Sequence, residues 1–192
     1  MATATYQRVR RKQLLREAEG YLDLATLFSD RWPLSSTLRD GLAQRTLDTL
    51  DNLQSTSGCK AMIAYLQGQA LRLMERHQEA IYALEKSAEL DPSNIHIWLA
   101  LGWCYKRTGR LDLAIQSLEE AMSIDANQAI VYYNLACYWA LACNAQHSLT
   151  YLTRAFQMDP TYRSLVAEER DFDPIREDPR FQLLTATVYE TE

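Results

Sequence analysis

The feature that most constrains this chain is an internal repeat. Three consecutive segments align with one another without gaps, namely residues 61–94, 95–128 and 129–162. Repeats of about 20 to 50 residues are typical of proteins that stack one small unit, because such a unit buries its apolar face only against its neighbours. The sequence therefore predicts a curved array of stacked units with one continuous core.

Composition favours helices as the content of each unit. The 192 residues include only 6 Gly and 5 Pro, which disfavours a turn-rich β fold, and 10% aromatic residues, which disfavours disorder. Within each repeat the apolar spacing predicts two amphipathic helices, with breaks near residues 75–77, 108–110 and 143–145. Prolines at Asp91-Pro92 and Asp159-Pro160 are expected to end second helices, because proline cannot continue the hydrogen-bond ladder.

The packing positions of the repeat show a recognisable pattern. The middle copy has Trp98, Leu101, Gly102, Tyr105, Ala114, Leu118 and Ala121, and it resembles the tetratricopeptide repeat, which places large, small and aromatic residues at these offsets. The other copies keep most size classes. The departures are Gln67 in the first copy, Cys143 in place of Gly109 in the third, and Ala126 in place of the closing proline in the middle copy itself. The resemblance implies an all-α fold, a right-handed α-solenoid of three helix pairs whose first helices line the concave face.

Residues 1–59 are expected to form a helical N-terminal cap. Two helical patterns, at about 4–28 and 36–54, are separated by Pro33 as breaker, and Ser35 or Ser36 is the expected N-cap. The second pattern follows the offsets of a second repeat helix at Thr46, Leu50 and Leu53, but Asp30 stands where a large aromatic belongs, so the segment is predicted to be a degenerate repeat. A basic cluster in the first pattern favours a solvated helix face over an anionic-partner site; it comprises Arg8, Arg10, Arg11 and Lys12.

The chain after the repeats, residues 163–192, is expected to form a helical C-terminal cap. Asp178 is the predicted N-cap of a short helix with Pro179 at its first position. The segment DPTYRSLVAEERDFDPIREDPRFQLL resembles the end-of-array unit of many bacterial tetratricopeptide proteins. That resemblance implies a bacterial origin and a cover over the apolar end of the last repeat, made by Phe172, Ile175, Phe181 and Leu184. The expected division is thus 1–59, 60–162 and 163–192.

The first helices of the repeats carry the predicted binding surface. Each helical residue advances about 100°, so the groove-facing residues lie away from the packing residues. The candidate partner-binding residues are Tyr65, Gln69, Arg72, His96, Leu99, Trp103, Lys106, Arg107, Tyr133 and Cys137. Aromatic residues beside arginine dominate binding energy at interfaces, so this groove suits a peptide with acidic and apolar anchors. Cys104 is expected to be packed, whereas Cys137 should react readily if the groove is open.

These observations predict a non-enzymatic scaffold or adaptor that binds a peptide or protein segment. The alternative is a self-assembling subunit whose groove or apolar end mediates homo-oligomerisation, and the chain's own termini could also fill the groove. Some members of the family clamp the C-terminal carboxylate of heat-shock chaperones with lysine, asparagine and arginine. That partner is not expected here, because the corresponding positions hold Tyr65, Gln69, Ala100, Ile130 and Asn134.

Other function classes have little support in the sequence. A net charge of -5 disfavours nucleic acid and anionic membranes as partners, and the apolar stretch 129–142 is shorter than the ~20 residues that span a bilayer. Four cysteines without a C-x-x-C pair and three scattered histidines predict no metal site, no cofactor and a reducing cytoplasm. Phosphate loops, G-x-S-x-G and H-E-x-x-H motifs are absent, so an enzyme is not expected.

Overall fold

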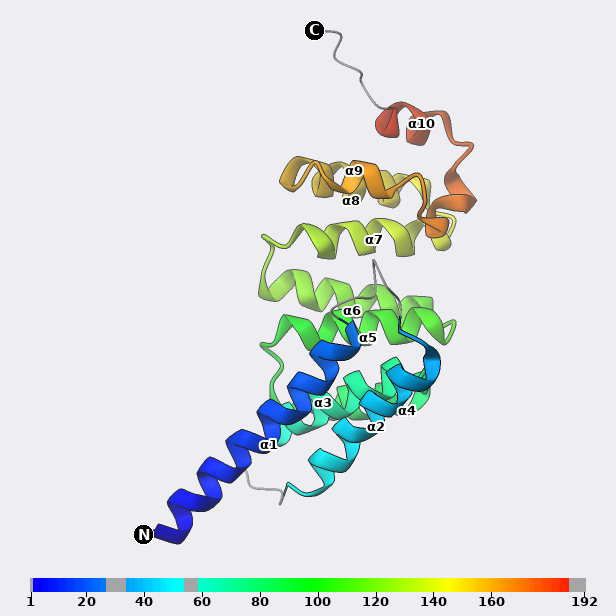
Figure 1. The fold of residues 1–192 in the computed structure, drawn as a ribbon. Helices are drawn as coiled ribbons and strands as arrows, with labels where there is room; N and C mark the ends of the chain where they lie inside the picture. Colours follow the sequence, from blue (N-terminus) through cyan, green and yellow to red (C-terminus); the bar gives the residue numbers. More distant parts are fainter. Residues whose placement is uncertain (1, 27–33, 54–58, 187–192) are drawn as a thin grey trace, which may run out of the picture. The chain divides into compact units, whose positions relative to one another are not determined.

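The computed structural model describes residues 2–26, 34–53 and 59–186 (Figure 1). Every regular element in these ranges is helical, which confirms the all-α prediction. The elements are α1 (Ala2–Thr26), α2 (Ser36–Asp51), α3 (Lys60–Leu73), α4 (His77–Leu90), α5 (Ile95–Arg107), α6 (Leu111–Ile124), α7 (Ala129–Leu141), α8 (Ala145–Met158), α9 (Tyr162–Leu165), the 3-10 helix η2 (Arg170–Ile175) and α10 (Pro179–Thr185).

The chain separates into two compact units, Met1–Ser93 and Asn94–Glu192. The first unit holds α1 to α4, and the second holds α5 to α10 with η2. The predicted boundaries at residues 59 and 162 follow the sequence repeat rather than these units, and they stay a prediction. In the described part of the chain, no helix is both long and apolar enough to cross a bilayer.

The same left-handed turn joins the two helices of each repeat. Glu75, Gly109 and Cys143, which occupy the same position in successive repeats, have φ angles of 59°, 75° and 55°. The next residue then donates its backbone N–H to a carbonyl in the last turn of the first helix, as in the bonds Arg76 to Leu71, Arg110 to Tyr105 and Asn144 to Trp139. Cys143 therefore adopts the backbone of the glycine it replaces, at a strain of about 1 to 2 kcal/mol.

Close helix packing recurs at the same positions in every pair. Three corresponding positions are buried in each second helix, namely Ala80, Leu84 and Ser87 in α4, Ala114, Leu118 and Ala121 in α6, and Ser148, Leu152 and Ala155 in α8. The first helices place a small residue opposite the leucine, so that a Cβ added at Gly68 would lie 2.5 Å from Cγ of Leu84. Small residues thus let the paired helices approach closely.

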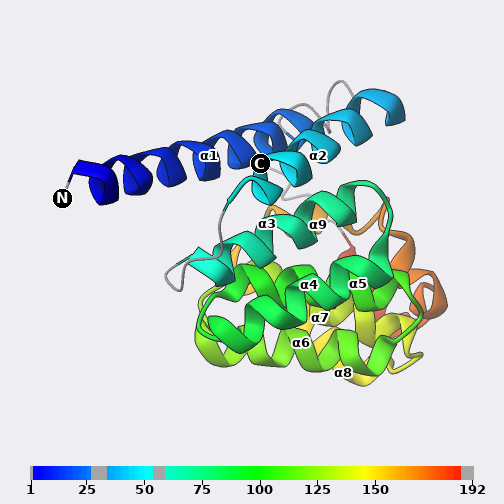
Figure 2. The ribbon, with the colours of Figure 1, turned by 90° about the horizontal axis from the view of Figure 1, so that it is seen from below.

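In the first unit, α1 and α2 lie side by side and pack on α3 (Figures 1 and 2). Thr46, Leu50 and Leu53 of this unit are buried, as their repeat offsets predict. Ser35 caps α2 by accepting the N–H of Leu38, which confirms one of the two predicted caps. Pro33, the predicted breaker, lies outside the described residues. The core of the unit comprises Ala18, Leu22, Ala43, Leu50, Leu53, Leu66 and Ala70.

Second helices end at the predicted aspartates. The helices α4 and α8 stop one residue before Asp91 and Asp159, each of which precedes a proline. The helix α6 ends at the same place without a proline, because Oδ1 of Asp125 accepts the N–H of Asn127 at 2.9 Å and forms a turn. A hydrogen bond from the Gln128 side chain, and then this bond from the backbone of Asn127, lower the pKa of Asp125. The turn explains why Ala126 is tolerated at the closing position.

Gly68→Ala is expected to lower the free energy of unfolding by about 1 to 3 kcal/mol, since Leu84 is fully buried and cannot move away from the added Cβ. Gly102→Ala is the matched control, because its Cβ would stand 3.3 Å from Leu118. That contact is looser than the one at Gly68, and its cost is offset by the ~0.5 to 1 kcal/mol of stability gained when alanine replaces a glycine in a helix interior. Urea unfolding followed by circular dichroism measures both, and equal losses would contradict the packing description.

Candidate functional site

The structure divides the predicted groove between the two units. Tyr65, Gln69 and Arg72 lie on α3 in the first unit. The other seven lie in the second unit, with His96, Leu99, Trp103, Lys106 and Arg107 on α5 and with Tyr133 and Cys137 on α7. Each set is therefore described within its own unit.

The α3 set is joined by hydrogen bonds and partly covered. Nε of Arg72 donates to Oε1 of Gln69 at 2.9 Å. Tyr65 packs against the core formed by α1, α2 and α3, and burial raises the pKa of its hydroxyl, while a bond to Gln69 and the charge of Arg72 oppose that rise. Tyr65, which the sequence predicts to line the groove, thus packs against the core that α1, α2 and α3 share.

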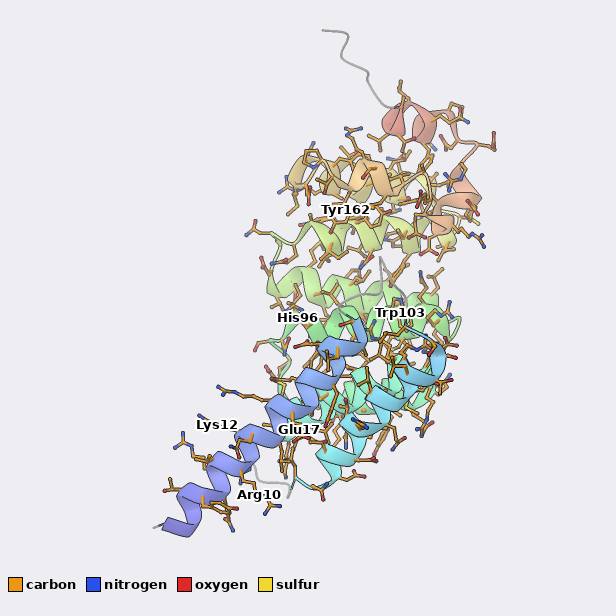
Figure 3. The ribbon with its side chains drawn as sticks, viewed as in Figure 1. Arg10, Lys12, Glu17, His96, Trp103 and Tyr162 are labelled. Atoms are coloured by element: carbon orange, nitrogen blue, oxygen red, sulfur yellow. The ribbon has the colours of Figure 1, made fainter. Side chains whose placement is uncertain are left out.

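One face of α5 carries exposed cationic and aromatic groups. The helix begins after Asn94, whose side chain accepts the N–H of His96 at 3.1 Å. His96, Leu99, Trp103 and Arg107 follow at spacings of three and four residues and so share a face, which we call the α5 face. His96 and Arg107 are exposed, and Leu99 and Trp103 are half-buried. The guanidinium of Arg107 lies 5.7 Å from the ring centroid of Trp103, within cation–π range. Figure 3 labels His96 and Trp103 on this helix.

Tyr133 and Cys137 are buried, at 5% and 2% exposure, so the structure does not leave these two predicted groove residues open to a partner. The reason is that the C-terminal segment lies over them. The ring of Tyr133 meets Tyr162 at a centroid distance of 4.8 Å and meets the edge of Phe172 at 5.8 Å. The sequence left open whether a partner, a second copy or the chain's own termini fill this part of the groove. In the structure, the chain's own C-terminal segment covers it.

The C-terminal cap is a packed element. Phe172, Ile175 and Phe181 are buried, as predicted, while Leu184 is half-buried. The rings of Phe172 and Phe181 meet at a tilt, with their centroids 5.4 Å apart, η2 packs on α7, and α10 packs on α8. The resemblance to the bacterial end-of-array unit stays a prediction.

The last helix begins as the sequence predicts. Asp178 caps α10 by accepting the N–H of Arg180 at 2.8 Å, and Pro179 follows at the first helical position. The hydrogen bond from the Arg180 side chain, with that backbone bond, lowers the pKa of Asp178 to about 2. Asp178 is therefore charged at neutral pH, where a carboxylate at a helix N-terminus is favourable.

Lys106 is held by the same segment. Its Nζ lies 2.5 Å from Oδ2 of Asp171 and 5.6 Å from the ring centroid of Tyr138. The side chains of Lys106 and Asp171 are only 22% and 16% exposed, so this pair is less screened by water than an ordinary surface ion pair. The cation predicted to meet an acidic partner thus already binds an acid of the chain itself.

A cluster that the sequence did not reveal lies beside this ion pair. Sγ of Cys137 and one carboxylate oxygen from each of Glu169 and Asp171 lie within 4.8 Å of one another. Burial, followed by the charges of Glu169 and Asp171, raises the pKa of the Cys137 thiol. The acidic run after Val166 is the only hint in the sequence, because it lies far from Cys137 along the chain and nothing local indicates the contact.

Cys143 is expected to react with a bulky thiol reagent at least about tenfold faster than Cys104 or Cys137, because Cys143 is exposed and the other two are buried. Cys59, which is half-buried, should fall between them. Mass spectrometry of the native protein labelled over a time course gives the four rates. Rapid labelling of Cys137 would show that the C-terminal segment does not cover it.

Phe172→Ala is expected to lower the free energy of unfolding by about 3 to 5 kcal/mol, because it empties a fully buried aromatic site. The same change should speed the labelling of Cys137 beneath it. Leu183→Ala on α10 is the matched control, since Leu183 is exposed and should contribute little. Similar losses for the two variants in thermal unfolding would refute the packing role of Phe172.

Comparison with known proteins identifies the repeat. A family model described as a tetratricopeptide repeat matches residues 71–136, which include the end of the first copy and most of the second. No curated protein sequence matches the chain.

Solved structures share the fold. A MamA crystal structure is 19% identical, covers 82% of this chain and 89% of its own, and has a TM-score of 0.55. YrrB, described as a TPR protein with an unusual peptide-binding site, is 19% identical, with coverages of 79% and 74% and a TM-score of 0.57. MamA from Desulfovibrio magneticus RS-1 is 14% identical, with coverages of 75% and 76% and a TM-score of 0.55. The family model thus identifies a tetratricopeptide repeat within residues 71–136, and the shared fold agrees with the packing positions of the three copies.

Proposed function

We propose that this protein is a non-enzymatic interaction scaffold whose α5 face binds a peptide or protein segment with acidic and apolar anchors. One observation carries the proposal. The chain's own C-terminal segment sets Asp171 against Lys106 and Phe172 against Tyr133, so an acid and an aromatic residue in succession bind next to this face. The C-terminal segment is therefore an internal example of a ligand that places an acidic and an aromatic side chain next to the α5 face.

The α5 face offers the same two kinds of contact to another chain. Trp103 supplies a large apolar surface, and Arg107 supplies a charge at 5.7 Å from that ring. Buried aromatic residues give most of the energy at interfaces, whereas an exposed ion pair contributes up to about 1 kcal/mol. Trp103 is therefore the proposed anchor, and Arg107 chiefly orients an acidic residue and speeds association.

Solved structures with the same fold, and the state of the cysteines, support the proposal of a protein-binding scaffold in the cytoplasm. YrrB, which shares the fold, is described as having a peptide-binding site. All four cysteines are free thiols, which supports a reducing cytoplasm. We propose no catalytic role, because the α5 face as defined holds one imidazole, that of His96, and no carboxylate, hydroxyl or thiol that would orient or activate it.

Homo-oligomerisation is the second candidate function. Leu165 on α9 and Leu183 on α10 are exposed on the C-terminal cap. Exposed apolar side chains at the end of a repeat array can pair with another copy. Light scattering at several concentrations of the wild type and of Leu183→Glu separates this candidate from peptide binding, since only self-association depends on that leucine.

Trp103→Ala is expected to weaken peptide binding about 30-fold or more, which corresponds to roughly 2 kcal/mol, because it removes the proposed anchor. Peptides selected from a displayed random library on the purified chain should combine acidic and aromatic residues, and fluorescence anisotropy gives their affinity. Tyr82→Ala is the matched control, since Tyr82 is an exposed aromatic residue on α4. Trp98→Ala, on the packing side of α5, should instead lower the melting temperature.

Two results would refute the α5 face as the binding surface. One is selection of peptides without acidic residues. The other is an equal loss of affinity in Trp103→Ala and Tyr82→Ala while both variants keep the wild-type melting temperature.

A further inference from the structure

The cluster beneath the C-terminal segment brings together three potential metal ligands. Cys137 lies on α7, Asp171 lies in η2, and Glu169 directly precedes η2. One ligand atom from each lies within 4.8 Å of the others, although the thiol and the acids are far apart in the sequence. Cys137 is buried and both acids are half-buried, so the cluster is not a solvated acidic patch.

A second observation at the same place is an unpartnered hydroxyl. Tyr133 lies one helical turn before Cys137 and is 5% exposed, and its hydroxyl has no hydrogen-bond partner among the described residues. Because Tyr133 and Cys137 are four residues apart on α7, they share a face of that helix, and the Tyr133 ring also meets Phe172 of η2 at a centroid distance of 5.8 Å. Buried polar groups are normally paired, and an orphaned one indicates a missing partner.

Among the described residues, the ion pair with Lys106 involves one of the two carboxylates of the cluster, while the guanidinium of Arg176 donates to the backbone carbonyl of Glu169 and pairs with Asp173. Lys106 is the cation bonded to Asp171, at 2.5 Å, and it neutralises one of the two carboxylates. A neutral thiol then leaves one negative charge in excess. A divalent cation bound to the thiolate and the two carboxylates, with Lys106 alongside, would make the cluster neutral.

We propose that Cys137, Glu169 and Asp171 bind a thiophilic divalent cation of the zinc type, with the Tyr133 hydroxyl beside the remaining coordination position. Zinc accepts thiolate and carboxylate ligands in a four-coordinate site, whereas magnesium and calcium prefer oxygen ligands alone. Binding replaces the thiol proton with a sulfur–metal bond and releases that proton to solvent. The cation would thereby join α7 to the segment that covers it.

Lys106 competes with the cation for Asp171. Its ammonium lies against the carboxylate oxygen Oδ2, so the metal must share Asp171 or displace the ammonium. The side chain of Lys106 is 22% exposed and can turn toward solvent. Lys106→Met should therefore raise the metal affinity, which a purely structural ion pair would not do.

Cobalt(II) is the probe, because a thiolate ligand gives it a sulfur-to-metal charge-transfer band in the near ultraviolet. Titration of the reduced, metal-free full chain without a histidine tag should give that band at one equivalent of cobalt, and zinc should abolish it. Cys137→Ser should remove the band, whereas Cys143→Ser, which changes an exposed thiol of the same unit, should keep it. Asp171→Asn should weaken cobalt binding about tenfold or more.

Thermal unfolding completes the test, because a ligand that binds only the folded chain raises its melting temperature. Zinc should raise the melting temperature of the wild type and of Cys143→Ser but not of Cys137→Ser. Absence of the charge-transfer band from the wild type overturns the proposal, as does a band that survives in Cys137→Ser. A Lys106→Met variant that unfolds like the wild type but binds cobalt no more tightly overturns the competition at Asp171.

Discussion

Each of the three repeat helix pairs depends on one close approach, in which the second helix packs against a small residue of the first. Leu84 fills the space over Gly68, and Leu118 contacts the corresponding Gly102. In the third pair the hydroxyl of Ser148 donates to the carbonyl of Ala136 at 2.8 Å, so a hydrogen bond accompanies the packing. Because this contact fixes the rotation of each first helix, it also decides which side chains point away from the partner helix. The α5 face exists as a consequence of that packing.

The C-terminal segment then decides how much of the first-helix surface stays accessible. The rings of Phe172 and Tyr162 contact the ring of Tyr133, and the carboxylate of Asp171 forms an ion pair with the ammonium of Lys106. An apolar helix end exposed to water would favour association, so covering α7 stabilises the folded chain. The same cover removes Tyr133 and Cys137 from contact with solvent. Stability at the end of the repeats is thus gained at the expense of binding surface.

The sequence predicts the parts of this structure that depend on local periodicity. The buried positions at Leu84, Leu118 and Leu152 recur once in each repeat, so aligning the repeats with one another identifies them. Turns and helix ends follow in the same way, since Asp178 and Pro179 carry their own capping signal. Even Cys143, an apparent departure, keeps the backbone of Gly109.

Contacts between segments distant in sequence are what the sequence could not show. Helical periodicity places Tyr133 and Cys137 on one face of α7, but it cannot say that Phe172 lies against Tyr133 or that Glu169 and Asp171 lie beside Cys137. The cluster of Cys137 with Glu169 and Asp171 is hidden for the same reason. An acidic run such as the one in the C-terminal segment predicts a solvated face, because charge runs usually are solvated, and only the fold shows that Asp171 pairs with Lys106.

Lys106 connects the two proposals. While its ammonium is bound to Asp171, an acidic anchor from a partner meets Arg107 as the cation beside Trp103. A divalent cation at Cys137, Glu169 and Asp171 that displaces the ammonium, rather than sharing Asp171 with it, would release Lys106 from the carboxylate. Because Lys106 lies on α5 one residue before Arg107, that release adds a second positive charge beside the α5 face. Metal and acidic peptide would then strengthen each other's binding by the same factor, since coupling between two sites is reciprocal.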